Sequence, residues 1–484
     1  MPKATIPDRF RPLVEATNEL AERFAAAQRT LYLVGGSVRD ALVAPGAGDP
    51  SPATPDDADV SGEGTPAPDY DLTTDATPDE IERIIEGWAE AKWTQGKRFG
   101  TIGCRKGPRV YEITTHRAEV YRADSRKPEV AFGTDIETDL SRRDFTVNAL
   151  ALKLPEMALV DPFHGLEDLA AGRLRTPLDP DVSFGDDPLR MLRAARFAAR
   201  FDLRPDAALV DAVRAGHGRL SIVSAERIRD ELDKIVVLPK PSGALWFVVE
   251  TGLAGEFLPE LPDMALEQDP IHRHKDVLAH TLAVVDKTSA GAVRPDRLLR
   301  LAALFHDVGK PKTRSFDRGG VSFHHHEVVG ARMTRQRMEA LHYPGDDIET
   351  VVTLVELHLR FHTYRLGWTD RAVRRYVRDA GPLLDRLNQL TRCDCTTRNE
   401  AKAKALGRRM DELERRIEEL RRQESLDAIR PDLDGNEIME RLGVPPGRAV
   451  GEALAFLMEL RLDEGPLGKE EAGRRLDGWW AARP

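Results

Sequence analysis

Two adjacent glycines, Gly35 and Gly36, separate a short apolar run at 31–34 from a helical pattern and so dictate a strand, a tight turn and a helix. Glycines let backbone N–H groups approach an anion closely, and the start of a helix favours negative charge. Ser37 and Asp40 have the spacing of a capping box. The turn therefore predicts a phosphate-binding helix start, with an ordinary tight turn as the alternative on these residues alone.

Two aspartates, Asp69 and Asp71, follow downstream at positions i and i+2. If this segment is extended, both carboxylates point to one face of a sheet, where their repulsion favours a cation between them. Mg²⁺ prefers hard oxygen ligands of this kind. Glu112 lies in a segment that alternates like a strand and is the candidate third carboxylate. A solvated acidic turn, and for Glu112 the wet face of a strand, are the alternatives.

Composition limits the class of protein. A chain of 484 residues is too long for one core and suggests about three domains. No apolar run approaches the ~18 residues of a membrane helix, and the N-terminus lacks the apolar region of a signal peptide. The three cysteines lack zinc-ligand spacing, so we expect a cytoplasmic protein. A net charge of −10 argues against a nucleic-acid coat over the whole surface, although arginines cluster locally.

The hydrophobic pattern changes along the chain. Residues 1–28 predict an amphipathic helix, and residues 44–68, rich in Pro, Gly, Ala and Asp, predict a flexible insertion. Short alternating and helical stretches are mixed over 69–160, whereas the chain beyond about 165 is almost wholly helical in pattern. Residues 401–424 predict a long amphipathic helix that acts as an intramolecular arm rather than a dimer zipper.

Several longer motifs narrow the interpretation of the turn at Gly35 and Gly36. Adjacent arginines at 142–143, beside an Asp, a hydroxyl and an amide, are suited to anion and ribose contacts, with the capping of a helix as the alternative on these residues alone. The motifs are, in order, GGSVRD (35–40), DYD (69–71), YEITTHR (111–117), RRDFTVNALAL (142–152) and DPFHGLEDL (161–169). Together they resemble the bacterial tRNA nucleotidyltransferase and poly(A) polymerase family, the class II branch of the polymerase-β-like nucleotidyltransferases. The resemblance covers most of residues 30–260.

The resemblance implies an α+β fold, in which an N-terminal polymerase-β-like sheet domain is followed by a mostly α-helical body with an HD domain and a helical tail. Its implied parts are a nucleotidyltransferase head at 1–165 that contains the insertion 44–68, and a helical neck at 166–265 that selects the nucleotide and binds RNA. An HD metal-binding domain follows at 266–400, and a helical arm and tail at 401–484 would bind tRNA.

Base selection is expected in the segment that starts at Asp186 and Asp187. In similar enzymes the second acid and the next arginine read the incoming base, roles that fall here to Asp187 and Arg190. A carboxylate accepts from the exocyclic amine of cytosine or adenine, whereas uracil and guanine would leave it unpaired. Many relatives have Glu where this chain has Asp186. Further arginines at helical spacing, Arg193 and Arg196, form a row of like charge that is easier to explain against an anion.

The remaining transferase roles come from the same residue-by-residue comparison. Gly36 and Arg39 would hold the triphosphate, and Arg143, Arg193 and Arg196 would bind further phosphate or ribose oxygens. Asp69 and Asp71 would hold Mg²⁺, with Glu112 as the third catalytic carboxylate. The implied reaction is in-line attack of an RNA 3′-hydroxyl on the α-phosphate of CTP or ATP, with release of pyrophosphate.

A histidine cluster marks the middle of the chain. The segment LFHDVGK at 304–310 resembles the HD phosphohydrolase superfamily. The resemblance implies a divalent metal, of unidentified kind, on His280, His306, Asp307 and Asp394, and His326 and His358 could extend the site to a second metal. The implied chemistry is that of a phosphatase or a 2′,3′-cyclic phosphodiesterase, and a purely structural HD domain is the alternative.

We therefore expect a CCA-adding tRNA nucleotidyltransferase that uses tRNA, CTP and ATP and has no membrane partner; the sequence leaves its oligomeric state open. A poly(A) polymerase shares nearly all the motifs and is the nearest alternative. An HD phosphohydrolase with a degenerate transferase is less favoured, because Asp69, Asp71, Arg143 and Asp187 are all present. A noncatalytic RNA-binding protein is least favoured, because paired metal carboxylates would then be an unneeded liability.

Overall fold

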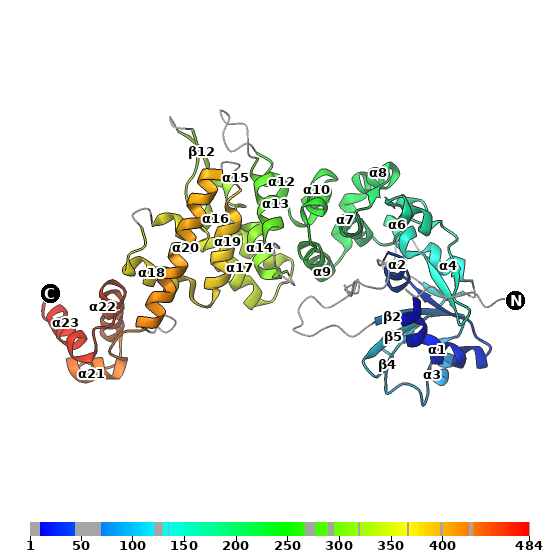
Figure 1. Ribbon diagram of the computed structural model, residues 1–484, viewed down its shortest axis with the longest axis horizontal. Coiled ribbons are helices and arrows are strands. Elements are labelled where there is room, and N and C mark those ends of the chain that lie inside the picture. The colour runs from blue at the N-terminus through cyan, green and yellow to red at the C-terminus, as the bar shows by residue number, and fades with distance from the viewer. Residues whose placement is uncertain are drawn as a thin grey trace. The chain divides into compact units, whose positions relative to one another are not determined.

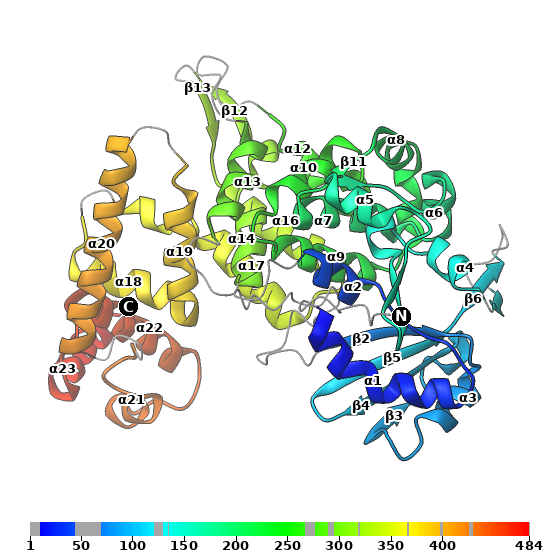
Figure 2. The same ribbon diagram turned by 45° about the vertical axis from the view of Figure 1, so that its right-hand side comes forward.

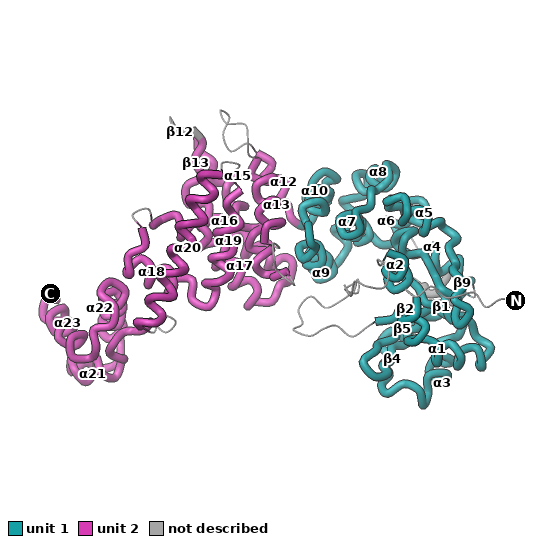
Figure 3. Tube along the Cα trace, viewed as in Figure 1, with its two compact units in different colours: residues 1–257 teal, residues 258–484 magenta. Residues whose placement is uncertain are grey.

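The computed structural model describes residues 10–43, 69–120, 129–133, 135–266, 276–288, 295–317, 320–364, 367–396, 400–424 and 429–483. The chain divides into two compact units, Met1–Phe257 and Leu258–Pro484 (Figure 3). Unit 1 combines a sheet with helices, whereas the described part of unit 2 is almost entirely helical (Figure 1). The predicted α+β class is thus confirmed. The predicted insertion at 44–68 lies outside the described residues.

A seven-stranded sheet organises unit 1, in the order β3-β4-β5-β2-β1-β8-β9. Its strands are β1 (Leu31–Val34), β2 (Asp69–Thr74), β3 (Ala91–Trp93), β4 (Thr101–Lys106), β5 (Arg109–Thr115), β8 (Ala151–Leu154) and β9 (Ala158–Val160). Strands β2 and β5 run parallel, and all other neighbouring pairs in this sheet run antiparallel. The parallel pair brings segments some forty residues apart into register at the centre of the sheet.

The other elements of unit 1 surround this sheet or follow it. The helices are α1 (Arg11–Ala26), α2 (Gly36–Val43), α3 (Pro78–Ile84), η2 (Lys97–Phe99), α4 (Ile136–Ser141), η3 (Thr146–Asn148), α5 (Gly165–Ala170), α6 (Pro180–Asp186), α7 (Leu189–Phe201), α8 (Ala207–Gly216), η4 (His217–Ile222), α9 (Ala225–Val236), α10 (Ser242–Glu250) and α11 (Ala254–Phe257). Two small sheets pair β6 (Arg117–Val120) with β7 (Glu129–Phe132), and β10 (Arg173–Leu174) with β11 (Arg204–Pro205).

Helices α1 and α3 cover one face of the large sheet (Figure 2). Leu20 and Phe24 of α1 are fully buried in that core, as the amphipathic pattern of this region predicts. The hydroxyl of Tyr111 on β5 donates to the Ala16 carbonyl at 2.8 Å and fixes α1 to the sheet. The side chains that alternate with this core therefore point to the opposite face.

Unit 2 is a succession of helices with one hairpin among its described residues. Its elements are α12 (Glu260–Asp263), α13 (Val277–Lys287), α14 (Arg297–Phe305), α15 (Lys310–Thr313), β12 (Arg314–Asp317), β13 (Gly320–Phe323), α16 (His326–Ala340), α17 (Gly345–Leu357), η5 (Arg360–Thr363), α18 (Asp370–Ala380), η6 (Gly381–Leu383), α19 (Leu384–Asp394), α20 (Glu400–Gln423), α21 (Gly435–Leu442), α22 (Arg448–Glu464) and α23 (Lys469–Ala481). Strands β12 and β13 are antiparallel.

Helix α20 is the long amphipathic helix that the sequence predicts. Met410, Leu413, Ile417 and Leu420 are buried, and the helix packs on α18 and α19 of the same chain. In the structure, α20 therefore packs within its own chain, as expected of an intramolecular arm. The last three helices, α21–α23, enclose a separate apolar cluster that includes Ile438, so the tail has a core of its own.

Candidate active site

Three carboxylates lie on the face of the sheet opposite α1 and α3. Asp71 of β2 stands directly beside Glu112 of β5 in the ladder, and Asp69 is two residues before Asp71 on the same strand. The neighbouring Tyr70 and Leu72 are buried in the core on the other face, whereas Asp71 and Glu112 are exposed. The extended conformation expected from the sequence thus gathers three oxygen-donor groups at one place.

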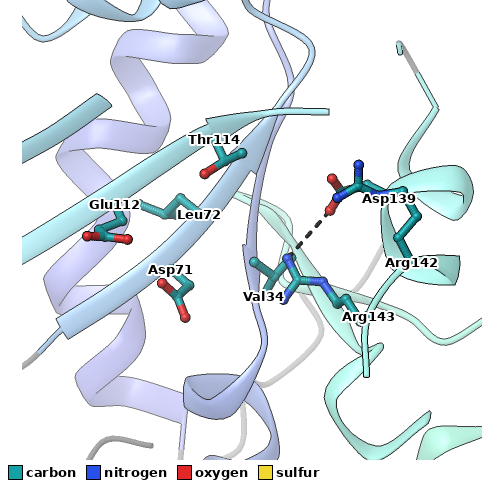
Figure 4. A pocket seen from close by; sticks show the side chains of 8 residues that line it. All are labelled: Val34, Asp71, Leu72, Glu112, Thr114, Asp139, Arg142 and Arg143. Atoms are coloured by element: carbon teal, nitrogen blue, oxygen red, sulfur yellow. Dashed lines mark hydrogen bonds and ion pairs between the residues drawn. The ribbon is translucent and has the colours of Figure 1, made fainter. Parts of the chain in front are cut away.

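A pocket opens above these carboxylates. It is lined by Val34, Asp71, Leu72, Glu112, Thr114, Asp139, Arg142 and Arg143 (Figure 4). Asp71 and Glu112 lie side by side on one wall, and Arg143 reaches in from the segment that follows α4 (Figure 4). An anion with an associated cation matches this combination of a guanidinium and carboxylates.

Arg143 is oriented by a residue that the sequence reasoning missed. Its Nη2 lies 3.5 Å from Oδ2 of Asp139, which is one helical turn earlier and buried on α4. The Arg143 Nε is buried and has no hydrogen-bond partner among the described residues. The i,i+4 spacing of Asp139 and Arg143 was the sequence signal that could have found this pair.

Gly35 brings the backbone against this pocket. Its φ of +73° lies in the left-handed region, which a side chain strains. A Cβ at this position would lie 3.2 Å from Nη1 of Arg143 and 3.6 Å from Oδ2 of Asp71. Gly36 is the first residue of α2, so the turn and the helix start lie beside both an arginine and a metal-ligand candidate. The predicted strand, turn and helix are all present.

Arg39 lies inside unit 1 rather than on the pocket wall. Its side chain is fully buried, donates to Asp40 and Asn148, and lies 4.1 Å from the ring centre of Phe201. The expected capping box of Ser37 and Asp40 is wrong, because Ser37 lies within α2 and its hydroxyl donates to the Asp69 carbonyl at 3.5 Å.

Asp187 and Arg190 lie at the turn between α6 and α7. Asp187 Oδ1 accepts from the Leu189 backbone N–H at 3.1 Å, and Oδ2 accepts from Nη2 of Arg227 at 2.8 Å. Arg190 donates to the hydroxyl of Ser183 at 2.8 Å and to the carbonyl of Arg142, a residue of the pocket wall. The two residues expected to read the base are therefore neighbours and are linked to the pocket through Arg142.

The next arginines of α7 meet carboxylates of the protein. Arg193 binds Asp144 at 2.7 Å, and burial opposes ionisation of Asp144, but Arg193 lowers its pKa below the ordinary range. Arg196 is 1% exposed and binds Glu231 of α9 at 2.5 Å. The sequence predicts an anion against the arginine row of α7. For Arg193 and Arg196 the negative charge comes from Asp144 and Glu231 of the same chain. The sequence could not pair residues so far apart.

A second cluster of titratable side chains lies in unit 2. All of its members lie in or directly beside helices, and they are His280, His306, Asp307, His326, His358 and Asp394. His280 Nε2 is 2.9 Å from Asp394 Oδ1 and 3.5 Å from Asp307 Oδ2. The other Asp307 oxygen faces Nε2 of His326 at 3.4 Å and of His358 at 4.0 Å. Asp307 therefore stands between two groups that could each hold a metal ion.

The outer nitrogen of every imidazole in this cluster is already occupied. Nδ1 lies within hydrogen-bond distance of a backbone carbonyl in His306, His326 and His358, at 2.8, 2.8 and 2.6 Å. In His280 it lies 2.7 Å from the Thr396 hydroxyl. Such contacts leave Nε2 as the inward acceptor, and Nε2 of His326 and His358 is buried with no hydrogen-bond partner among the described residues. The donor set fits a divalent metal.

Neighbouring charges shift the pKa values of the histidines in this cluster. Burial disfavours a charged His306, but Asp307 and Asp394 raise its pKa to about 10. Burial and the neighbouring charge of His306 lower the pKa of His358 to about 3. Lys310, which the sequence reasoning did not select, lies 2.7 Å from Asp307, and its i,i+3 spacing was the signal that could have found it. The ammonium group of Lys310 thus lies beside the carboxylate that also faces the histidines.

Comparisons with family models match three segments of the chain. A model described as the poly A polymerase head domain matches residues 31–175, and one described as the probable RNA and SrmB-binding site of polymerase A matches residues 202–264. The HD domain model matches residues 277–399. The first segment contains the carboxylate pocket, and the last contains the ligand candidates from His280 to Asp394.

Curated relatives match large parts of this chain. An A-adding tRNA nucleotidyltransferase of Deinococcus radiodurans is 36% identical over 357 residues, which cover 72% of this chain and 80% of that protein. A CC-adding tRNA nucleotidyltransferase of Thermus thermophilus is 32% identical and covers 71% and 77%. A CCA-adding enzyme of Lactobacillus helveticus is 35% identical over a shorter match, which covers 48% and 52%.

Solved structures share the fold. The crystal structure of the Bacillus stearothermophilus CCA-adding enzyme in complex with CTP matches 99% of both chains with a TM-score of 0.69 and 21% identity. At this identity the likeness establishes the fold alone. Among the described helices of our protein, none is both long and apolar enough to cross a membrane.

Proposed function

This chain belongs to the bacterial tRNA nucleotidyltransferase and poly(A) polymerase family, and we propose that it adds C, C and A to the 3′ end of tRNA without a nucleic-acid template. The observation that carries the proposal is the pocket in which Asp71 and Glu112, paired across β2 and β5, face Arg143 beside the Gly35 turn. The A-adding, CC-adding and CCA-adding relatives support tRNA as the substrate.

The proposed reaction is attack of the tRNA 3′-hydroxyl on the α-phosphate of CTP or ATP, with pyrophosphate as the leaving group. Backbone N–H groups at Gly35 and Gly36 and the Arg143 guanidinium would orient the triphosphate. Asp69, Asp71 and Glu112 are the groups that would hold Mg²⁺. Magnesium bound there would neutralise charge on the reacting phosphate and favour the ionised hydroxyl. Arg39 is buried against Asn148, and Arg196 is buried against Glu231. We therefore propose that these two arginines stabilise the fold around the site.

Base selection is assigned to Asp187 and Arg190. Asp187 would accept from the exocyclic amine shared by cytosine and adenine, and Arg190 would donate to the adjacent ring acceptor. This assignment is supported by their proximity at the α6–α7 turn and by the link from Arg190 to Arg142. Arg193 remains a candidate for ribose or phosphate contact, because its side chain is partly exposed beside Asp144.

The proposal includes a four-part organisation: a head at 1–165, a neck at 166–265, an HD domain at 266–400, and an arm and tail at 401–484 that would bind tRNA. The separate apolar cluster of α21–α23 supports an independent tail. A cytoplasmic location is also proposed, and it is supported by the three cysteines, which are all free thiols.

A partial reaction is the second candidate. The relatives from Deinococcus and Thermus, which match more than two thirds of this chain, are A-adding and CC-adding enzymes. Either activity alone would leave part of the CCA end to a second enzyme. The same pocket would serve either reaction, since both transfer a nucleotide to an RNA 3′-hydroxyl.

One experiment separates these candidates. The full chain is incubated with tRNA that lacks CCA, with tRNA that ends in CC, and with an unrelated RNA, each with CTP and ATP separately and together. Sequencing of the 3′ ends should reveal CCA on the first substrate and A on the second. Addition of A to the second tRNA alone would replace the proposal by A addition, and addition of CC that stops there would replace it by CC addition. A long A tail on the unrelated RNA would identify a poly(A) polymerase.

We also propose that the cluster around Asp307 is a metal centre. His280, His306, Asp307 and Asp394 would hold one divalent ion, and His326 and His358 would extend the centre to a second. Metal bound there would supply an activated water for a phosphohydrolase. Metal analysis of the full chain tests the centre, and hydrolysis of a 2′,3′-cyclic phosphate on RNA tests the activity. A metal-free protein that retains its fold would overturn the assignment.

A further inference from the structure

The hairpin of β12 and β13 connects two ligand candidates of the unit 2 cluster. It follows α15, in which Nζ of Lys310 lies 2.7 Å from Oδ2 of Asp307. It precedes His326, whose Nδ1 lies 2.8 Å from the carbonyl oxygen of Phe323 at the end of β13. The two strands project from the helices of unit 2 (Figure 2). The base of the hairpin is therefore fixed beside the cluster, and its strands lead away from it.

One face of this hairpin combines aromatic and cationic side chains. Residues directly opposite one another in an antiparallel pair share a face, and so do residues two apart on one strand. Arg314 is opposite Phe323, and the next pair on the same face is Phe316 with Val321. The Arg314 guanidinium lies 4.8 Å from the centre of the Phe316 ring, and Nζ of Lys310 lies 5.7 Å from the centre of the Phe323 ring. We call these five residues the hairpin face.

The outer part of the hairpin face is open to solvent and carries positive charge. Phe316 is 69% exposed, the highest value among the large hydrophobic residues that the structure describes. Residues 310–317 contain the cations Lys310, Lys312 and Arg314 against one acid, Asp317, in a chain with a net charge of −10. Single-stranded nucleic acids stack their bases on aromatic rings and pair their phosphates with cations. The hairpin face offers both kinds of contact at one place.

We propose that the hairpin face binds single-stranded RNA and leads its phosphorylated end to the unit 2 centre. The inference rests on the proposed phosphohydrolase role of that centre. A base stacks on Phe316, Arg314 pairs with a phosphate, and Lys310, which has three N–H donors, meets the terminal phosphate beside Asp307. Phe316 is two residues farther from the base of the hairpin than Arg314, about 7 Å along the strand. Only an oligonucleotide spans both positions, so the centre prefers a phosphoester on RNA to the same phosphoester on a single nucleotide.

The alternative is a hairpin that only stabilises unit 2. The contact of Arg314 with Phe316 is then a local cation–π pair, which is weak at an exposed site. Unit 1 contains a matched pair, in which the Arg98 guanidinium lies 4.5 Å from the ring centre of Phe99, a residue that is also exposed. A purely local pair predicts that loss of either ring has no effect on RNA at the unit 2 centre. Since both rings are exposed, their substitution should leave the fold intact.

The experiment compares the full-length wild type with Phe316→Ala, Phe316→Trp and the control Phe99→Ala. The substrates are a tetranucleotide RNA that ends in a 2′,3′-cyclic phosphate and the corresponding mononucleotide, neither of which has a 3′-hydroxyl for the transferase site to extend. Hydrolysis adds water across one P–O bond of the ring and leaves a phosphomonoester and a hydroxyl. Separately, the tetranucleotide with 4-thiouridine before its last nucleotide is photocrosslinked to the full chain, and the crosslinked residues are identified by mass spectrometry.

Phe316→Ala should lower kcat/KM for the tetranucleotide about tenfold, as expected for the loss of one stacked base, and leave the mononucleotide within about twofold. Phe316→Trp and Phe99→Ala should keep the wild-type preference for the tetranucleotide. The crosslink to the hairpin should be lost in Phe316→Ala alone. A wild-type crosslink confined to other segments, or an unchanged preference in Phe316→Ala, overturns the inference. Wild-type protein that hydrolyses neither substrate contradicts the proposed phosphohydrolase, while the crosslink still decides whether the hairpin face binds RNA.

Discussion

Gly35 affects both the backbone conformation of the turn and the space available in the pocket. Its positive φ is needed for the strand-to-helix turn, and its missing side chain leaves room for Arg143 and Asp71. These two requirements can be separated with Gly107, in the turn between β4 and β5. Gly107 also has a positive φ, of 57°, but a Cβ added there would meet no other atom within 4 Å.

Gly35→Ala and Gly107→Ala should each destabilise unit 1 by about 1–2 kcal/mol, because a Cβ is strained in the left-handed region. Only Gly35→Ala should lower kcat/KM for CTP, since its methyl group meets Arg143. Thermal unfolding and steady-state kinetics of both variants make the comparison. Equal activity of the two variants would show that the turn does not bear on the triphosphate.

His116 should give the head a measurable pH dependence. It is 1% exposed, with Nδ1 2.9 Å from the Thr73 hydroxyl, and burial lowers its pKa below the usual value of 6.5. Between the lowered pKa and 6.5 the unfolded chain binds more protons, so stability falls as the pH decreases through that window. His116→Asn should show a flatter decline in melting temperature from pH 7.5 to 5 than the wild type. Parallel curves would rule out this contribution.

At the scale of elements, helix α9 packs on helix α7, which begins at the turn that we propose reads the base. The Arg196–Glu231 pair is buried on both sides, with side chains 1% and 3% exposed. Removing one partner leaves a buried charge without compensation, whereas removing both does not.

Arg196→Met should therefore destabilise unit 1 by about 3–5 kcal/mol, and Arg196→Met with Glu231→Met should recover most of that loss. Urea unfolding, with hydrogen exchange followed in the α7 and α9 peptides, measures the effect. A double variant as unstable as the single one would mean that Arg196 acts through another contact.

Strand β2 and helix α7 show which features of the site could be predicted from the sequence and which could not. The i,i+2 spacing of Asp69 and Asp71 needed only an extended strand, and the structure has one. The spacing of Arg193 and Arg196 predicts a shared helix face but not what lies opposite it. Their partners, Asp144 and Glu231, come from distant segments. Tertiary packing therefore decided which arginines reach the pocket, and local periodicity carried no information on that choice.

At the scale of the whole molecule, the described residues include a carboxylate and arginine pocket in unit 1 and a histidine and aspartate cluster in unit 2. The ligand candidates of unit 2 come from α13, α16, α19 and the segments that follow α14 and α17. Motif resemblance, rather than spacing, identified them in the sequence, because helical packing alone brings residues from His280 to Asp394 together.

His358→Ala should reduce the metal bound by the full chain while nucleotide transfer to tRNA stays within about twofold of the wild type. Its imidazole belongs to the unit 2 cluster and is buried there. Metal content by mass spectrometry and a transfer assay give the two readouts. A matching loss of transfer would mean that the two centres depend on one another.

The central claim is that nucleotide transfer takes place at the carboxylates of β2 and β5. The most direct test is the rate of CMP transfer to tRNA lacking CCA, measured for the full-length wild type and Asp71→Asn. The variant should be slower by about a thousandfold or more, since a group acting on the reacting phosphate is removed, and its unit 2 metal content should be unchanged. Transfer at the wild-type rate by Asp71→Asn would contradict the claim.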